Sequence, residues 1–97
     1  MKYGTDQITE ERVRQIEDCG FDVHFDVKNN SDGQLVQAAI AIIEEPEVYR
    51  LHKKPLNWDA DLWAKMCAKP QKERLVLAGT WNAAEIDRQQ EVMLNGE

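Results

Sequence analysis

The sequence has little cysteine and no long apolar run. Two of its 97 residues are cysteines, Cys19 and Cys67, which is too few for the disulfide framework of a small secreted domain. No segment is apolar enough to span a membrane, and residues 1–4 lack the apolar start of a signal peptide. We therefore expect a cytoplasmic protein without a membrane partner.

Positive charge is also scarce. The chain has 12 Lys and Arg against 18 Asp and Glu, which gives a net charge of −6. Nucleic-acid surfaces need clustered Lys and Arg to neutralise phosphates, so we expect no direct DNA binding. A chain of 97 residues is near the lower limit for an independent core, which a homodimer or larger homo-oligomer would enlarge. We expect a single helical domain over residues 1–97, with tails at 1–8 and 92–97.

Sequence motifs of catalysis are missing as well. There is no nucleophile elbow, glycine-rich phosphate loop, HExxH zinc motif or pair of metal-binding cysteines. We therefore assign no catalytic residue, no metal ligand and no cofactor. The sequence favours a protein that acts by binding over an enzyme.

The pattern that is present is helical. Apolar residues spaced three apart predict a first helix over residues 9–19, which Gly20 would end in a left-handed conformation. Residues 21–27 then alternate apolar and polar, and no partner strand follows them, so we predict an extended, half-buried loop. A capping box formed by Ser31 and Gln34 predicts the start of a second, buried helix.

The second half of the chain predicts one short and one long helix. Asp59 is suited to be the N-cap of the short helix, and Pro70 suits the first turn of a long helix over residues 69–94. Gly79 lies in the middle of the long helix, where glycine costs about 1 kcal/mol relative to alanine, so we expect a neighbouring helix to pack closely on it. The predicted fold class is all-α: a small bundle of three main helices and a short helix, with an extended loop after the first.

Aromatic and basic residues gather in the second half and form the main candidate for ligand or partner binding. Trp58 and Trp81 could stack on a base, while Lys69 and Arg74 could bind a phosphate. The alternative is that the tryptophans only consolidate a small core and the basic residues shield it.

His24 and Asp26 form a second candidate for binding. In an extended segment, side chains two residues apart face the same way and could share a ligand such as a divalent ion. The alternative is a loop histidine that hydrogen-bonds a nearby carboxylate or carbonyl.

Several segments resemble, in the same order, a group of short phage and prophage proteins of unassigned activity. The matching segments are ERVRQI at 11–16, DGQLVQAA at 32–39, LVLAG at 75–79 and AEIDR at 84–88. The resemblance implies a phage-type accessory protein in the host cytoplasm, whose partner is a host protein or a small nucleotide ligand. Such a protein could inhibit a host defence system by blocking a CRISPR effector or by sequestering a nucleotide signal.

The helical layout is also similar to that of MazG-like, all-α nucleotide pyrophosphohydrolases. In this alternative, carboxylates would converge in the bundle and bind magnesium to hydrolyse nucleoside triphosphates. The candidate carboxylates are Glu10, Glu11, Glu44 and Glu85. The paired ExxE and ExxD motifs of those enzymes are not reproduced in this sequence, so binding without catalysis is the first hypothesis.

Overall fold

The structure, a computed structural model, describes residues 2–95 and confirms the all-α fold. This part of the chain forms six helices and no strand: α1 (Gly4–Cys19), α2 (Val23–Asn29), α3 (Gln34–Ala41), α4 (Glu47–Leu51), α5 (Ala60–Cys67) and α6 (Gln71–Asn95). Within the same range, no helix combines the length and the apolar character needed to cross a membrane.

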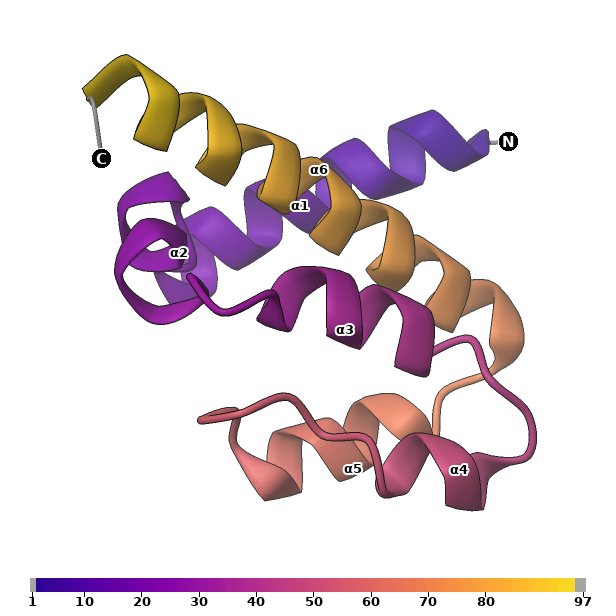
Figure 1. The fold of residues 1–97 in the computed structure, drawn as a ribbon. Helices are drawn as coiled ribbons and strands as arrows, with labels where there is room; N and C mark the ends of the chain where they lie inside the picture. The colour runs from indigo at the N-terminus through magenta and orange to yellow at the C-terminus, as the bar shows by residue number, and fades with distance from the viewer. Residues whose placement is uncertain (1, 96–97) are drawn as a thin grey trace.

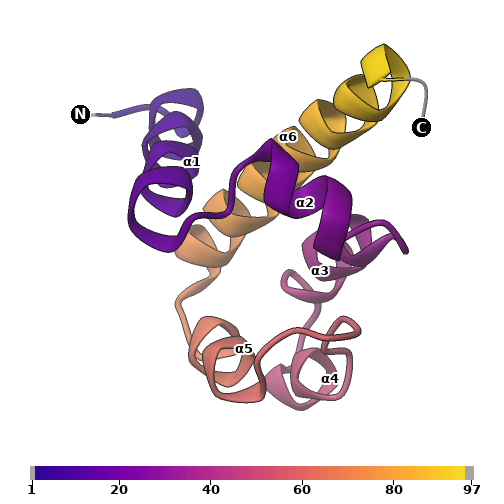
Figure 2. The ribbon, with the colours of Figure 1, turned by 90° about the vertical axis from the view of Figure 1, so that its left-hand side faces the viewer.

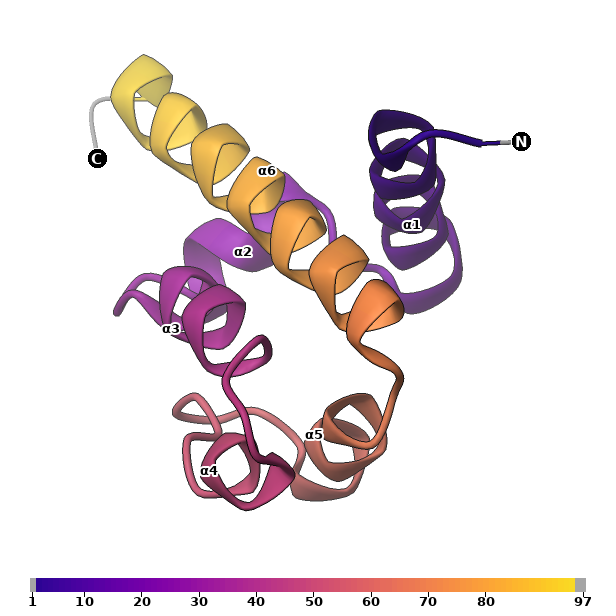
Figure 3. The same cartoon turned by 90° about the vertical axis from the view of Figure 1, so that its right-hand side faces the viewer.

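The long helix α6 is the spine of the fold (Figure 1). Helix α1 lies on one side of it, and α2 and α3 lie on the other (Figure 2 and Figure 3). Helices α4 and α5 pack together beside the N-terminal end of α6. The buried apolar core is made by Leu35, Ala38, Ala39, Ala41, Ile42, Trp63, Cys67, Leu77, Ala78, Trp81 and Ala84. Helices α3, α5 and α6 and the residues next to them therefore supply the core, and α1 supplies none of it.

The predicted tails at the two ends of the chain are largely helical. Helix α1 begins at Gly4 instead of residue 9. Helix α6 continues through residue 92 to Asn95. The remaining tail residues, 1 and 96–97, lie outside the described part of the chain.

Helix α2 replaces the extended loop that the sequence predicted, and that prediction was wrong. Gly20 ends α1 as expected, with a left-handed φ of 72°. Asp22 then caps α2, because its carboxylate accepts a hydrogen bond from a backbone N–H of the first turn. In the helix, Asp26 and Asn30 have i,i+4 spacing and share a buried face, which the alternating pattern concealed.

Helix α3 begins near the predicted capping box but uses different groups. Gly33, with φ of 83°, is the N-cap, and no side chain caps it, so the predicted Ser31 cap does not form. Gln34 does reach back, and its Oε1 accepts a hydrogen bond from the N–H of Asp32 at 2.8 Å. One face of α3 is buried in the core, as expected of a buried helix, while Val36 and Ile40 on the other face are exposed.

Helix α5 begins as predicted and fixes the middle of the core. The carboxylate of Asp59 accepts a hydrogen bond from the N–H of Leu62 at 2.8 Å. One turn later, Trp63 is buried, and its Nε1 donates to the carbonyl of Arg50 at 2.9 Å. The cap thus sets the register that points Trp63 inward.

The close contact expected at Gly79 is present, and the side chain of Ile8 makes it. A Cβ at Gly79 would lie 2.5 Å from Cδ1 of Ile8. Helix α1 therefore crosses α6 at the glycine, and Ile8 occupies the space that a larger residue would fill. This contact fixes the position of α1 against α6.

Candidate functional site

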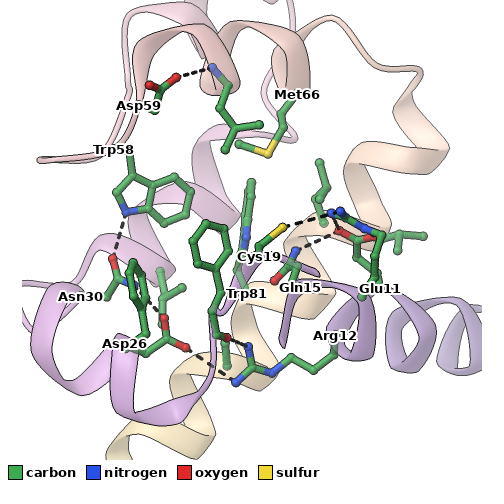
Figure 4. A pocket seen from close by; sticks show the side chains of 18 of the residues that line it. Glu11, Arg12, Gln15, Cys19, Asp26, Asn30, Trp58, Asp59, Met66 and Trp81 are labelled. Atoms are coloured by element: carbon green, nitrogen blue, oxygen red, sulfur yellow. Dashed lines mark hydrogen bonds and ion pairs between the residues drawn. The ribbon is translucent and has the colours of Figure 1, made fainter. Parts of the chain in front are cut away.

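A cavity of about 890 Å³ lies between α1, α2, α5 and α6. Its volume is in the range of roughly 300–1,000 Å³ that is typical of small-molecule sites. Side chains from three parts of the chain point toward one another around it: Arg12 from α1, Asp26 from α2 and Trp58 from the loop before α5 (Figure 4). The fold thus brings together residues that are far apart in the sequence.

Two tryptophans of a three-tryptophan cluster form the apolar wall of this cavity. The rings of Trp58 and Trp81 meet edge to face, with centroids 5.2 Å apart and an interplanar angle of 74°. Both rings line the cavity, while Trp63 packs against them and lies outside the lining. Trp58 is half-buried, and its Nε1 donates to Oδ1 of Asn30 at 2.9 Å. This hydrogen bond fixes the orientation of the most accessible ring.

A buried carboxylate and an arginine form the polar end of the cavity. Asp26 is 2% exposed, and its Oδ1 accepts a hydrogen bond from Nδ2 of Asn30 at 2.8 Å. The NH1 group of Arg12 donates to the carbonyl of Phe21 at 2.8 Å, and its NH2 group lies 3.6 Å from Oδ2 of Asp26. Burial raises the pKa of Asp26, although the Asn30 hydrogen bond and the Arg12 charge oppose this shift.

Charged side chains from α1 and from the α5 region face each other across the cavity. Arg14 donates two hydrogen bonds to Glu11, at 2.8 and 2.7 Å, and these bonds lower the pKa of Glu11 against the opposing effect of burial. The charge of Lys69 lowers that pKa as well. Lys65 and Lys69 both line the cavity, and neither ammonium group makes an ion pair or hydrogen bond with another described residue.

The structure brings four of the six predicted site residues into this one cavity, namely Trp58, Lys69, Trp81 and Asp26. His24 lies elsewhere: its side chain is 78% exposed, and its Nδ1 is 4.0 Å from Oε1 of Glu91. Because α2 is helical, positions 24 and 26 point in nearly opposite directions around the helix axis. The expectation that His24 and Asp26 face the same way was therefore wrong.

Arg74, the sixth predicted residue, belongs to the framework and does not line the cavity. It is 4% exposed, and each of its three nitrogens donates inside the protein. The acceptors are the carbonyls of Ile42 and Lys69, at 3.0 and 2.9 Å, and a carboxylate oxygen of Glu45 at 2.7 Å. Those two carbonyls follow the C-terminal ends of α3 and α5, where a positive charge is favourable.

The polar lining residues that the sequence reasoning missed include Arg12, Asn30 and Lys65. Asn30 could have been predicted from the sequence, because Asp22 is a good N-cap and a helix that begins there places positions 26 and 30 on one face. Arg12 could not have been predicted, because its contact with Asp26 joins two helices across a turn, and no local sequence pattern encodes such a contact.

Comparisons with known proteins add no identification, since no family model, curated protein or solved structure matches this chain. The resemblance to phage proteins and the likeness to MazG-like enzymes therefore stay predictions, as does assembly into a homo-oligomer. Within residues 2–95, no three His, Cys, Asp or Glu side chains are grouped so that they could hold one metal ion.

Proposed function

We propose that this chain acts by binding, and that its cavity holds a small nucleotide. In a phage-type accessory protein, such binding would withdraw a nucleotide signal from a host defence system. The observation that carries the proposal is the cavity of about 890 Å³, which has tryptophans on its wall and two lysines among its lining residues. Aromatic faces and cationic groups are the two features that a base and a phosphate need.

The aromatic wall suits a planar ring. Trp58 is half-buried and held by its hydrogen bond to Asn30, so one surface of the indole is preorganised before a ligand arrives. Preorganisation lowers the entropy lost on binding. Base–aromatic stacking contributes about 1–3 kcal/mol per base in nucleic-acid complexes, which is enough for a measurable affinity when a phosphate is bound as well.

The lysines suit a phosphate. Lys65 lies in the last turn of α5 and Lys69 in the bend that follows this helix, and both side chains line the cavity. Lysine binds phosphate as a flexible point charge, and these two ammonium groups are not engaged with other described residues. Together they would offset the negative charge that the rest of this acidic chain presents to the ligand.

The arrangement of the four carboxylates that a hydrolase would need supports binding without hydrolysis. Each makes an ion pair with a different basic residue: Glu10 with Lys2, Glu11 with Arg14, Glu44 with Lys53 and Glu85 with Arg88. A magnesium-dependent hydrolase would need several of them to converge on one ion. Incubation with nucleoside triphosphates and magnesium, followed by pyrophosphate detection, distinguishes the two functions, and we expect no release.

Isothermal titration calorimetry with the four ribonucleoside 5′-monophosphates tests the proposal. We expect saturable binding that Lys69→Gln weakens about 5-fold, equivalent to about 1 kcal/mol. Lys72→Gln is the matched control, because Lys72 is a neighbouring lysine that does not line the cavity. The proposal fails if no nucleotide gives a binding signal, or if both lysine variants weaken binding equally.

A further inference from the structure

Two polar atoms at one end of the cavity have no hydrogen-bond partner. Among the described residues they are the two buried side-chain atoms in this condition: Nε of Arg12 and Oδ2 of Asp26. Both residues line the cavity, and their charged groups point toward each other (Figure 4). The closest contact between them, 3.6 Å from NH2 to Oδ2, is too long for a hydrogen bond.

The remaining atoms of these two side chains hold them in place. Oδ1 of Asp26 accepts from Asn30 at 2.8 Å, and NH1 of Arg12 donates to the carbonyl of Phe21 at 2.8 Å. One acceptor and one donor, on two neighbouring side chains, are thus left unsatisfied. A buried donor or acceptor without a partner costs free energy, so such a pair calls for a third group that completes it.

We infer that this pair reads the polar edge of a guanine base, an inference that rests on the proposed function. A guanine edge presents a carbonyl oxygen beside an N–H and an amino group. The N–H of Arg12 would donate to the carbonyl oxygen, and the base N–H would donate to Oδ2 of Asp26. Adenine lacks the carbonyl and presents one donor group there instead of two, so a carboxylate favours guanine. The cavity therefore assigns guanine nucleotides as the ligand class.

Comparing guanosine 5′-monophosphate with its N1-methyl derivative by calorimetry tests this on the unaltered protein. The methyl group removes the donor that would face Asp26 but keeps the charge and the stacking surface. We expect the derivative to bind about 10-fold or more weakly. Equal affinities would mean that a water molecule completes the pair, and the inference would fail while the proposed function stands. If no nucleotide binds at all, the proposed function fails first.

Asp26→Asn supplies a second test, because it replaces the free acceptor with an amide donor and can keep the hydrogen bond from Asn30. We expect affinity for guanosine 5′-monophosphate to fall about 10-fold and the preference over the N1-methyl derivative to shrink to less than about 2-fold. Asp59→Asn, which removes the same charge from another lining residue, should keep that preference. If Asp26→Asn weakens both ligands equally, Asp26 has only a structural role and the inference is overturned.

Discussion

Arg74 and Arg12 are both arginines that join separate helices, but their surroundings differ. All three nitrogens of Arg74 donate hydrogen bonds, and the neighbouring Arg50 likewise donates through each of its nitrogens. Arg12 makes one hydrogen bond, to Phe21, and leaves Nε without a partner. The carboxylates of Asp26 and Asp87 lie 3.6 and 3.7 Å from its NH2 group, which is too far for either to accept a hydrogen bond. One arrangement is complete without a ligand, and the other is not.

This difference separates a structural role from a binding role better than residue type does. Arginine in the second half of the chain suggested a phosphate site, yet Arg74 caps the carbonyl ends of two helices. No pattern in the sequence predicted Arg12 as a site residue, yet it lines the cavity and its Nε has no hydrogen-bond partner. The degree of saturation of a buried charge is therefore the property that distinguishes the two sites.

The largest effect should come from removing the saturated arginine. Arg74→Met leaves the carbonyls of Ile42 and Lys69 without their donors, and we expect the free energy of unfolding to fall by about 3 kcal/mol. Arg12→Met loses one hydrogen bond and the longer charge contacts with Asp26 and Asp87, at 3.6 and 3.7 Å, and should cost less, about 1–2 kcal/mol. Urea unfolding followed by circular dichroism measures both. Equal losses would remove the distinction between the two arginines.

A smaller effect is expected where α1, the helix that carries Arg12, crosses α6. Gly79→Ala gains about 1 kcal/mol of helix propensity but displaces Cδ1 of Ile8. In an Ile8→Val background, which lacks that atom, the same substitution should be more favourable by about 1 kcal/mol. Unfolding free energies of the four proteins in this cycle give the coupling. Simple additivity would show that the close contact carries no energetic weight.

The smallest effect is a pH dependence at the unsaturated site. Burial raises the pKa of Asp26 above 3.8, so the cost of its buried charge is absent at lower pH. This cost appears as the pH rises above that value and is complete above the folded pKa. Asp26→Asn should therefore gain stability relative to the parent as the pH rises through this window. Glu11→Gln is the opposite control: the pKa of Glu11 is lowered, so the variant should lose relative stability as the pH rises.

Unfolding curves recorded across the acidic range report both differences in pH dependence. If the free energy of unfolding of Asp26→Asn does not rise relative to that of the parent as the pH rises, Arg12 compensates the charge of Asp26 fully. The site would then be saturated in the same sense as Arg74, and the comparison between the two arginines would no longer hold.

Local signals in the sequence predicted the elements that local chemistry controls. Gly20 and Asp59 end and begin helices where expected, and Gly79 receives the close contact that its position implied. The prediction failed at α2, because residues 21–27 alternate like a strand, while the i,i+4 pair of Asp26 and Asn30 that marks the helix extends beyond them. It failed at Arg74 because only the folded chain shows which carbonyls need a donor.

The most direct measurement follows the arginine Nε–H signals by NMR during titration with guanosine 5′-monophosphate. If Arg12 and Asp26 bind the base, the Arg12 signal shifts and its proton becomes protected from exchange with water, while the signals of Arg50 and Arg74 stay where they are. An Arg12 signal that does not change at saturating nucleotide would show that Arg12 does not bind the ligand, and so would a ligand-induced shift centred on Arg74.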